Sequence, residues 1–201
     1  MRLHTYVVRY DSGFAPNPFF GFCTLATCKP DIRRSAQLGD WVVGTGSADK
    51  TVNRGGFLVY LMRITETMPF QDYWADLRFQ LKKPNLHGSK KHLCGDNIYS
   101  WDATTNSWHQ LDSFHRNKDG SPNQRHIARD TGTNHVLISD DFAYFGAKGP
   151  KVPKAFAAIC KKGRGLKIVT DAKLIADFVD WARTLGRWGF KGVPYDWATM
   201  P

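Results

Sequence analysis

The sequence predicts an α+β fold, built round a curved antiparallel or mixed sheet or a small β-barrel, with flanking helices. Runs of β-branched and aromatic residues recur at uneven spacing, and segments with helical periodicity interrupt them. The 201 residues are 42% hydrophobic, which is enough for the core of one domain. We expect a single domain over residues 1–201, with a core at about 1–155 and a strand–helix extension at about 156–201.

The expected strands share β-forming residues and end at turn-forming ones. They lie at 4–10, 22–28 (as a short strand or an extended segment), 40–46, 55–66, 98–111 (as a two-stranded hairpin), 135–146 and 166–170. Two long polar stretches, 82–97 and 112–134, are expected to be loops.

Three segments carry helical signals, at 29–38, 68–81 and 171–185. Pro30 suits a first helical turn, because its fixed φ is already helical. The third segment has an apolar stripe from Leu174 to Leu185. Thr170 is its expected N-cap, and Gly186 is expected to end it.

Charge and aromatic content favour a polyanionic partner. Lys and Arg number 28 against 18 Asp and Glu, which gives a net charge of +10, and 13% of residues are aromatic. Cations hold phosphates and aromatic rings stack on bases, so we expect a nucleic acid, first of all DNA, or a nucleotide. No run is apolar enough for a membrane span and no signal peptide is visible, so the cytoplasm is the expected location.

The segment "VVGTGSADKT" raises the possibility of a phosphate-binding loop. A P-loop needs a glycine, four residues, then Gly-Lys-Ser/Thr, and a dinucleotide fingerprint needs a third glycine in a βαβ unit. Neither spacing is met. Two readings stay open: a tight turn that leaves a strand, or a base or sugar contact from Thr45, Gly46 and Ser47.

Cysteine and histidine spacing raises the possibility of zinc. Cys23 and Cys28 form one pair, and His87, His92 and Cys94 form a second cluster. No C-x2-C pair is present, and buried structural thiols are the commoner outcome in an apolar stretch. We expect no metal and no cofactor.

Acid–base candidates gather in the second polar stretch. His115, His126 and Asp130 are of the residue types that move protons in catalysis. No spacing ties them to a nucleophile such as Cys23 or Ser139. Solvated loop charge is the alternative reading.

Basic residues interleaved with Gly, Pro and aromatic residues suit the phosphates of a nucleic acid. In the stretch 82–97 the predicted phosphate contacts are Lys90 and Lys91. A plain solvated surface is the alternative.

Two blocks carry a family resemblance. "YVVRYDSGFAPNPFFGFCTLATCKPDIRRSAQLGDWVVGTGS" and the later "HVLISDDFAYFG" resemble the nucleotide modification associated domain family, type 2, over residues 2 to about 155. The resemblance implies a bacterial or phage protein linked to DNA base modification. It implies a process and identifies no catalytic residue.

A second resemblance concerns the fold. A strand, a loop, a short basic helix and "GD" before an apolar strand are similar to PUA-like domains of the EVE, YTH and ASCH groups. Those domains hold a modified or flipped base in a pocket, so the resemblance implies pocket walls at 29–40 and 45–47. This chain is longer and adds two polar loops.

A base pocket needs a stacking ring and polar groups on the base edge. The candidates for polar contacts to the base edge are Asn17, Thr24, Thr45 and Ser47. The candidates for stacking on the base are Phe19, Trp41 and Tyr144. Lys29, Arg33 and Arg34 are the candidates for contacts to the flanking phosphates. Core packing is the alternative for Phe19 and Trp41.

The sequence thus favours a protein that recognises a modified base or nucleotide in a DNA-modification, restriction or phage-defence system, alongside partner proteins of that system. An enzyme that alters a nucleotide or base, as a transferase or hydrolase, is the rival hypothesis. A protein-interaction subunit is the third.

Overall fold

The computed structural model describes residues 1–200 as a mixed α+β protein. The chain forms two compact units, each assembled from separate stretches of sequence. Unit 1 comprises residues 1–11, 36–65 and 139–201, and unit 2 comprises residues 12–35 and 66–138. The single-domain organisation expected from the sequence stays a prediction.

Unit 1 is built on a six-stranded sheet in the order β10-β1-β3-β4-β9-β11. Its strands are β1 (Leu3–Val8), β3 (Trp41–Gly46), β4 (Leu58–Arg63), β9 (Asp141–Tyr144), β10 (Leu166–Val169) and β11 (Gly189–Phe190). β1 runs parallel to β3 and β9 runs parallel to β11, while the other neighbours are antiparallel. The sheet ends at β10 and β11, so the predicted mixed sheet is confirmed and the closed barrel is not formed.

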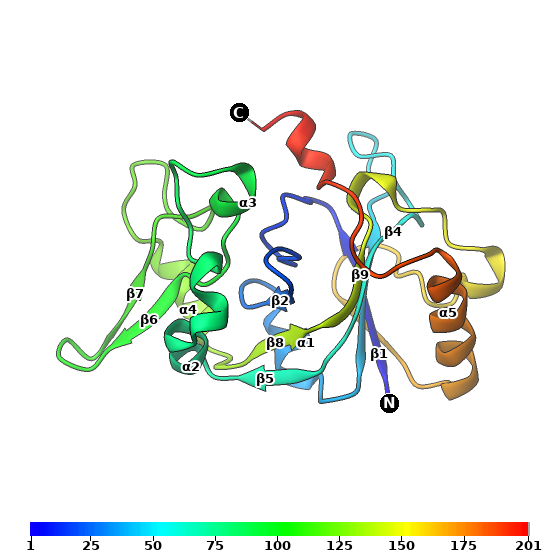
Figure 1. Cartoon of the computed structure of the whole chain (residues 1–201), viewed down its shortest axis with the longest axis horizontal. Coiled ribbons are helices and arrows are strands. Elements are labelled where there is room, and N and C mark those ends of the chain that lie inside the picture. Colours follow the sequence, from blue (N-terminus) through cyan, green and yellow to red (C-terminus); the bar gives the residue numbers. More distant parts are fainter. Residues whose placement is uncertain (201) are drawn as a thin grey trace. The chain divides into compact units, whose positions relative to one another are not determined.

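Helix α5 (Ala172–Thr184) packs against one face of this sheet (Figure 1). Its buried residues Ile175, Phe178 and Ala182 share a core with strand residues such as Val43 and Leu61. The helix is the one expected at 171–185, but its cap differs. Asp171, not Thr170, is the N-cap, because its carboxylate accepts the Leu174 N–H at 3.0 Å.

The start of β3 is fixed by Asp40. Gly39 adopts φ +82°, a conformation that favours glycine. The Asp40 carboxylate then accepts hydrogen bonds from the main-chain N–H groups of Arg2 at 2.7 Å and Gln37 at 3.2 Å. Asp40, the second residue of the "GD" pair, therefore links the start of β3 to Arg2, the residue before β1.

Unit 2 carries a small sheet in the order β2-β8-β5 and a separate hairpin of β6 and β7. The strands are β2 (Cys23–Leu25), β5 (Glu66–Met68), β6 (Tyr99–Asp102), β7 (Ser107–Gln110) and β8 (Val136–Ser139). The helices are α1 (Pro30–Ser35), α2 (Phe70–Ala75), α3 (Lys90–Leu93), α4 (Gln124–Thr131) and the 3-10 helix η1 (Leu77–Lys82).

Several predicted elements are divided in the structure. The helix expected at 68–81 ends at Ala75, and Asp76 caps the 3-10 helix that follows by accepting the Arg78 N–H. The strand expected at 135–146 breaks at Asp140 into β8 and β9, which belong to different sheets. The polar stretch 112–134 contains α4, so it is not all loop. None of the helices at residues 1–200 is both long and apolar enough to span a membrane.

Candidate active site

The candidate site lies wholly in unit 2 and begins at the turn between β2 and α1. Cys28 and Lys29 adopt φ values of +56° and +41°, a conformation that costs energy for residues with a side chain. Pro30 then starts α1. This turn leaves Cys28 half-buried rather than inside the strand, where Cys23 is buried completely.

The side chain of Arg33 holds this turn in place through hydrogen bonds to main-chain carbonyls. Its side chain is fully buried, and its Nε donates to the Cys28 carbonyl at 3.0 Å. The other guanidinium nitrogens donate to the carbonyls of Asp130 at 2.6 Å, Thr133 at 2.8 Å and His135 at 2.9 Å. Helix ends leave such carbonyls without partners, so Arg33 both closes the end of α4 and ties it to Cys28.

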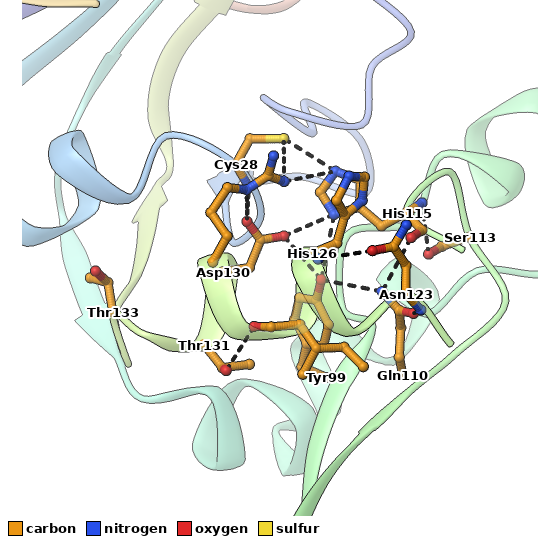
Figure 2. Close-up of polar contacts among 12 residues, drawn as sticks. Cys28, Tyr99, Gln110, Ser113, His115, Asn123, His126, Asp130, Thr131 and Thr133 are labelled. Atoms are coloured by element: carbon orange, nitrogen blue, oxygen red, sulfur yellow. Dashed lines mark hydrogen bonds and ion pairs between the residues drawn. The ribbon is translucent and has the colours of Figure 1, made fainter. Parts of the chain in front are cut away.

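His115 faces the sulfur of Cys28 from the loop between β7 and α4 (Figure 2). The Cys28 Sγ lies 3.2 Å from His115 Nε2. On the other side of the ring, His115 Nδ1 lies 2.8 Å from Asp130 Oδ2. Cysteine, histidine and aspartate therefore form one continuous chain of polar contacts.

Asp130 is held by further donors. The Cys28 N–H donates to its Oδ1 at 3.1 Å, and Arg129 Nε donates to the same oxygen at 3.0 Å. The Tyr99 hydroxyl donates to Oδ2 at 3.0 Å (Figure 2). A carboxylate with this many donors has a fixed orientation, and it fixes the His115 ring in turn.

The α4 helix presents Asp130 because its first turn is capped locally. The Asn123 side chain accepts the His126 N–H at 3.1 Å, and the Asn123 N–H donates to Gln110 Oε1 at 2.9 Å. Gln110 also donates to the Tyr99 hydroxyl at 3.4 Å. The hairpin and α4 are thereby joined behind the His115–Asp130 pair.

These contacts shift the pKa of both partners. Burial acts to lower the pKa of His115, but the hydrogen bonds to Asp130 and Cys28 outweigh it and raise that pKa to about 9. Burial acts to raise the pKa of Asp130, but the hydrogen bond and charge of His115, together with Arg129, lower that pKa to about 2. At neutral pH the pair is therefore an imidazolium beside a carboxylate.

Such a cluster is suited to covalent catalysis. A cation beside a cysteine sulfur favours the thiolate, which is the nucleophilic form. A histidine at hydrogen-bond distance can carry the proton to a leaving group, and a buried aspartate holds its ring in the required orientation. The arrangement can perform acyl transfer or hydrolysis through a thioester.

The structure brings the predicted acid–base residues together. The rings of His115 and His126 lie 4.3 Å apart, and Asp130 is bonded to His115. Sequence reasoning missed Cys28 as a candidate nucleophile, because it considered this residue only as a metal ligand paired with Cys23 or as a buried structural thiol. The signal available in the sequence was a cysteine two residues before the proline that starts a helix. No three His, Cys, Asp or Glu side chains among residues 1–200 are grouped as a metal site.

The predicted base-contact residues of unit 2 have partners within that unit. The Asn17 amide donates to the Cys94 carbonyl at 2.7 Å, and its oxygen accepts Lys82 Nζ at 2.6 Å. The Thr24 hydroxyl donates to the buried Asp96 at 2.7 Å. Phe19 is buried. Their role in base recognition stays a prediction.

The predicted base-contact residues of unit 1 are also buried. Trp41 packs edge-on against Trp188 at 5.8 Å, and Tyr144 stacks on Phe190 at 5.7 Å while its hydroxyl donates to Asp11. The Ser47 hydroxyl accepts the Asp49 N–H at 3.1 Å.

Thr45 and Gly46 lie at the end of β3. The Thr45 hydroxyl has no hydrogen-bond partner in the part of the chain that the structure describes. A Cβ at Gly46 would meet the Arg54 carbonyl, which is why glycine stands there. A base contact from these residues stays a prediction.

The predicted phosphate contacts differ in accessibility. Arg33 is buried against main-chain carbonyls, whereas the Arg34 side chain is 63% exposed. Lys29 follows Cys28 in the β2–α1 turn, and Lys90 and Lys91 form the start of α3. Of this set, Lys29 and Arg33 lie next to Cys28.

Comparison with known proteins identifies the family. The sequence matches the family described as nucleotide modification associated domain 2 over residues 1–201. Neither the curated proteins nor the solved structures contain a significant match. The description associates the chain with nucleotide modification, as the sequence resemblance implied. Because the match spans the whole chain, this protein belongs to the nucleotide modification associated domain 2 family.

Proposed function

We propose that this protein is a thiol-dependent acyltransferase or hydrolase that acts on a nucleotide or DNA base. One observation supports the proposal above the others: Cys28 Sγ, His115 and Asp130 form a single contact chain with distances of 3.2 and 2.8 Å. The family description, which associates the domain with nucleotide modification, supports a nucleotide or base as the substrate. This contact chain favours the rival hypothesis from the sequence, in which the protein is an enzyme, over the hypothesis that it only binds a modified base.

The proposed reaction has two balanced steps. In the first, the Cys28 thiolate attacks a carbonyl carbon, the S–C bond forms, and the bond to the leaving group breaks as His115 donates its proton to that group. In the second, water or an acceptor amine or hydroxyl gives its proton to His115 and attacks the thioester. The S–C bond then breaks and releases the thiolate. Asp130 stays ionised throughout.

Alkylation with iodoacetamide tests the nucleophile without a known substrate. We expect Cys28 to react faster than Cys160, which is also half-buried but contacts no histidine among residues 1–200, so each sample contains its own control. Peptide mapping by mass spectrometry measures both rates. His115→Asn and Asp130→Asn are expected to slow Cys28 by about 10-fold or more and to leave Cys160 unchanged.

An activated ester tests turnover. With p-nitrophenyl acetate we expect a burst of nitrophenol and an acetyl group on Cys28 in the wild-type protein, and neither in Cys28→Ser. Equal alkylation of Cys28 and Cys160 that His115→Asn does not change would refute the proposed function.

Recognition of a modified base is a second proposal, and the net charge of +10 supports nucleic-acid binding. Filter binding to modified and unmodified DNA across a salt series tests it, with steep salt dependence expected. No binding to DNA, RNA or nucleotides at low salt would contradict it. We also propose that the protein belongs to a restriction or phage-defence system and acts there with partner proteins, because its family is associated with nucleotide modification. The proposed location is the cytoplasm, where thiols such as that of Cys28 stay reduced.

A further inference from the structure

Arg129 reaches the same sulfur as His115. Its Nη2 lies 3.8 Å from Cys28 Sγ and 3.5 Å from His115 Nε2, while its Nε donates to Asp130 at 3.0 Å. The guanidinium is therefore anchored at one edge and lies beside the nucleophile at the other. A substrate oxygen that accepts a hydrogen bond from Nη2 of Arg129 at about 2.9 Å would lie next to the carbon that Cys28 attacks.

The guanidinium keeps hydrogen-bonding capacity that the protein does not use. The contacts of Arg129 involve Nε and Nη2, and its Nη1 has no hydrogen-bond partner among residues 1–200. The side chain is 40% exposed, so a small molecule can reach it. Arginine presents its donors as a planar fork, which suits a carboxylate or a phosphate.

The local charge balance also favours an anion. His115 and Arg129 are both cationic at neutral pH, although their nitrogens lie 3.5 Å apart. Lys29 adds a third cation at the turn, and its electrostatic interactions include Cys28 and Arg129. Against these stands the Asp130 carboxylate. An anionic substrate group beside Nη1 and Nη2 would offset the excess positive charge.

We propose that the substrate carries an oxyanion, a carboxylate or a phosphate, beside the carbon that Cys28 attacks, and that Arg129 binds this oxyanion. The inference rests on the proposed function of Cys28 and adds the substrate class. It makes Arg129 a substrate-binding residue in addition to a partner of Asp130.

A pair of alkylating agents isolates this role. Iodoacetate and iodoacetamide react identically: the sulfur forms a bond to the CH2 carbon, and iodide leaves with the electron pair of the C–I bond. Only iodoacetate carries a carboxylate beside that carbon. The ratio of the two Cys28 rates therefore reports an anion site, whereas a change in thiolate content moves both rates together.

We expect the iodoacetate-to-iodoacetamide ratio at Cys28 to exceed that of free cysteine by about 10-fold or more in wild-type protein. Arg129→Gln should return the ratio to the free-cysteine value, and Arg129→Lys should restore part of it. Arg125→Gln is the matched control, because Arg125 is an exposed arginine one turn earlier on α4. This substitution removes the same charge as Arg129→Gln. It should leave the ratio unchanged.

Inorganic phosphate and acetate then distinguish the two sources of oxyanion. Protection of Cys28 from iodoacetate by phosphate indicates a nucleotide phosphate, and protection by acetate indicates a carboxylated substrate. A wild-type ratio equal to that of free cysteine, or equal losses in Arg129→Gln and Arg125→Gln, would overturn the inference. The proposed function would survive this outcome if iodoacetamide alkylation still depended on His115, and would fail with it if Cys28 reacted with neither agent faster than Cys160.

Discussion

Arg33 Nη2 donates to the main-chain carbonyl of Asp130 at 2.6 Å, although the two residues lie 97 positions apart. The same guanidinium holds the carbonyl of Cys28 at 3.0 Å. One buried side chain therefore sets the position of the proposed nucleophile relative to the aspartate that orients its histidine. Stability of unit 2 and geometry of the site depend on the same contacts.

Arg33→Lys is expected to destabilise the protein by about 3 kcal/mol, because a lysine cannot reach all the carbonyls that the guanidinium bonds and would leave some buried without partners. Urea unfolding measures the loss. Arg34→Gln is the control, since the Arg34 side chain is largely exposed and should matter by less than about 0.5 kcal/mol. Equal stability of the two variants would show that the buried contacts contribute nothing.

The His115–Asp130 pair should make stability depend on pH. The pKa of His115 rises on folding from 6.5 to about 9, so its protonation stabilises the folded state fully below pH 6.5. This contribution is lost as the pH rises through 9, and the shift corresponds to about 3 kcal/mol. The difference in unfolding free energy between wild type and His115→Gln should therefore shrink between pH 6.5 and 9.

His126 provides the control for this pH dependence. Burial lowers the pKa of His126, so wild type should lose stability relative to His126→Gln as the pH falls below 6.5. The two histidines thus predict opposite slopes in urea unfolding at a series of pH values. A pH-independent difference for His115→Gln would contradict the ion pair.

Gly44→Ala should destabilise unit 1 by about 1–3 kcal/mol, because a Cβ there would lie 2.5 Å from Tyr60 Cε1 and 2.6 Å from Val8 Cγ2. The Tyr60 ring lies against Gly44, and its hydroxyl donates to the Tyr6 hydroxyl at 3.0 Å. Urea unfolding checks the effect. A variant as stable as wild type would remove the packing explanation for this glycine.

Thr45→Val should leave stability unchanged or raise it by about 1 kcal/mol, because the buried Thr45 hydroxyl has no hydrogen-bond partner among the described residues. Ser47→Ala is the comparison, since the Ser47 hydroxyl accepts the Asp49 N–H and its loss should destabilise. Filter binding to DNA on the same variant separates the two readings of this segment. Weaker binding by a stable Thr45→Val would support a base contact.

The sequence determined much of the local structure. The apolar stripe of residues 171–185 predicted α5, and two short strand segments around a central turn at 98–111 predicted the β6–β7 hairpin. These features follow from local periodicity and turn chemistry, which act over a few residues. The boundaries at Asp76 and Asp140 escaped prediction, because side-chain capping and assignment to different sheets override a continuous apolar pattern.

Only the tertiary structure decided the candidate site. His115 and Asp130 were recognised as acid–base candidates by residue type, but Cys28 lies 87 positions from His115 and nothing between them fixes their distance. Their meeting depends on the β2–α1 turn, on the cap of α4 and on the buried Arg33, each of which forms only when distant segments pack together. Local sequence patterns encode the type of an element, whereas a contact between loops depends on the packing of the elements that carry them.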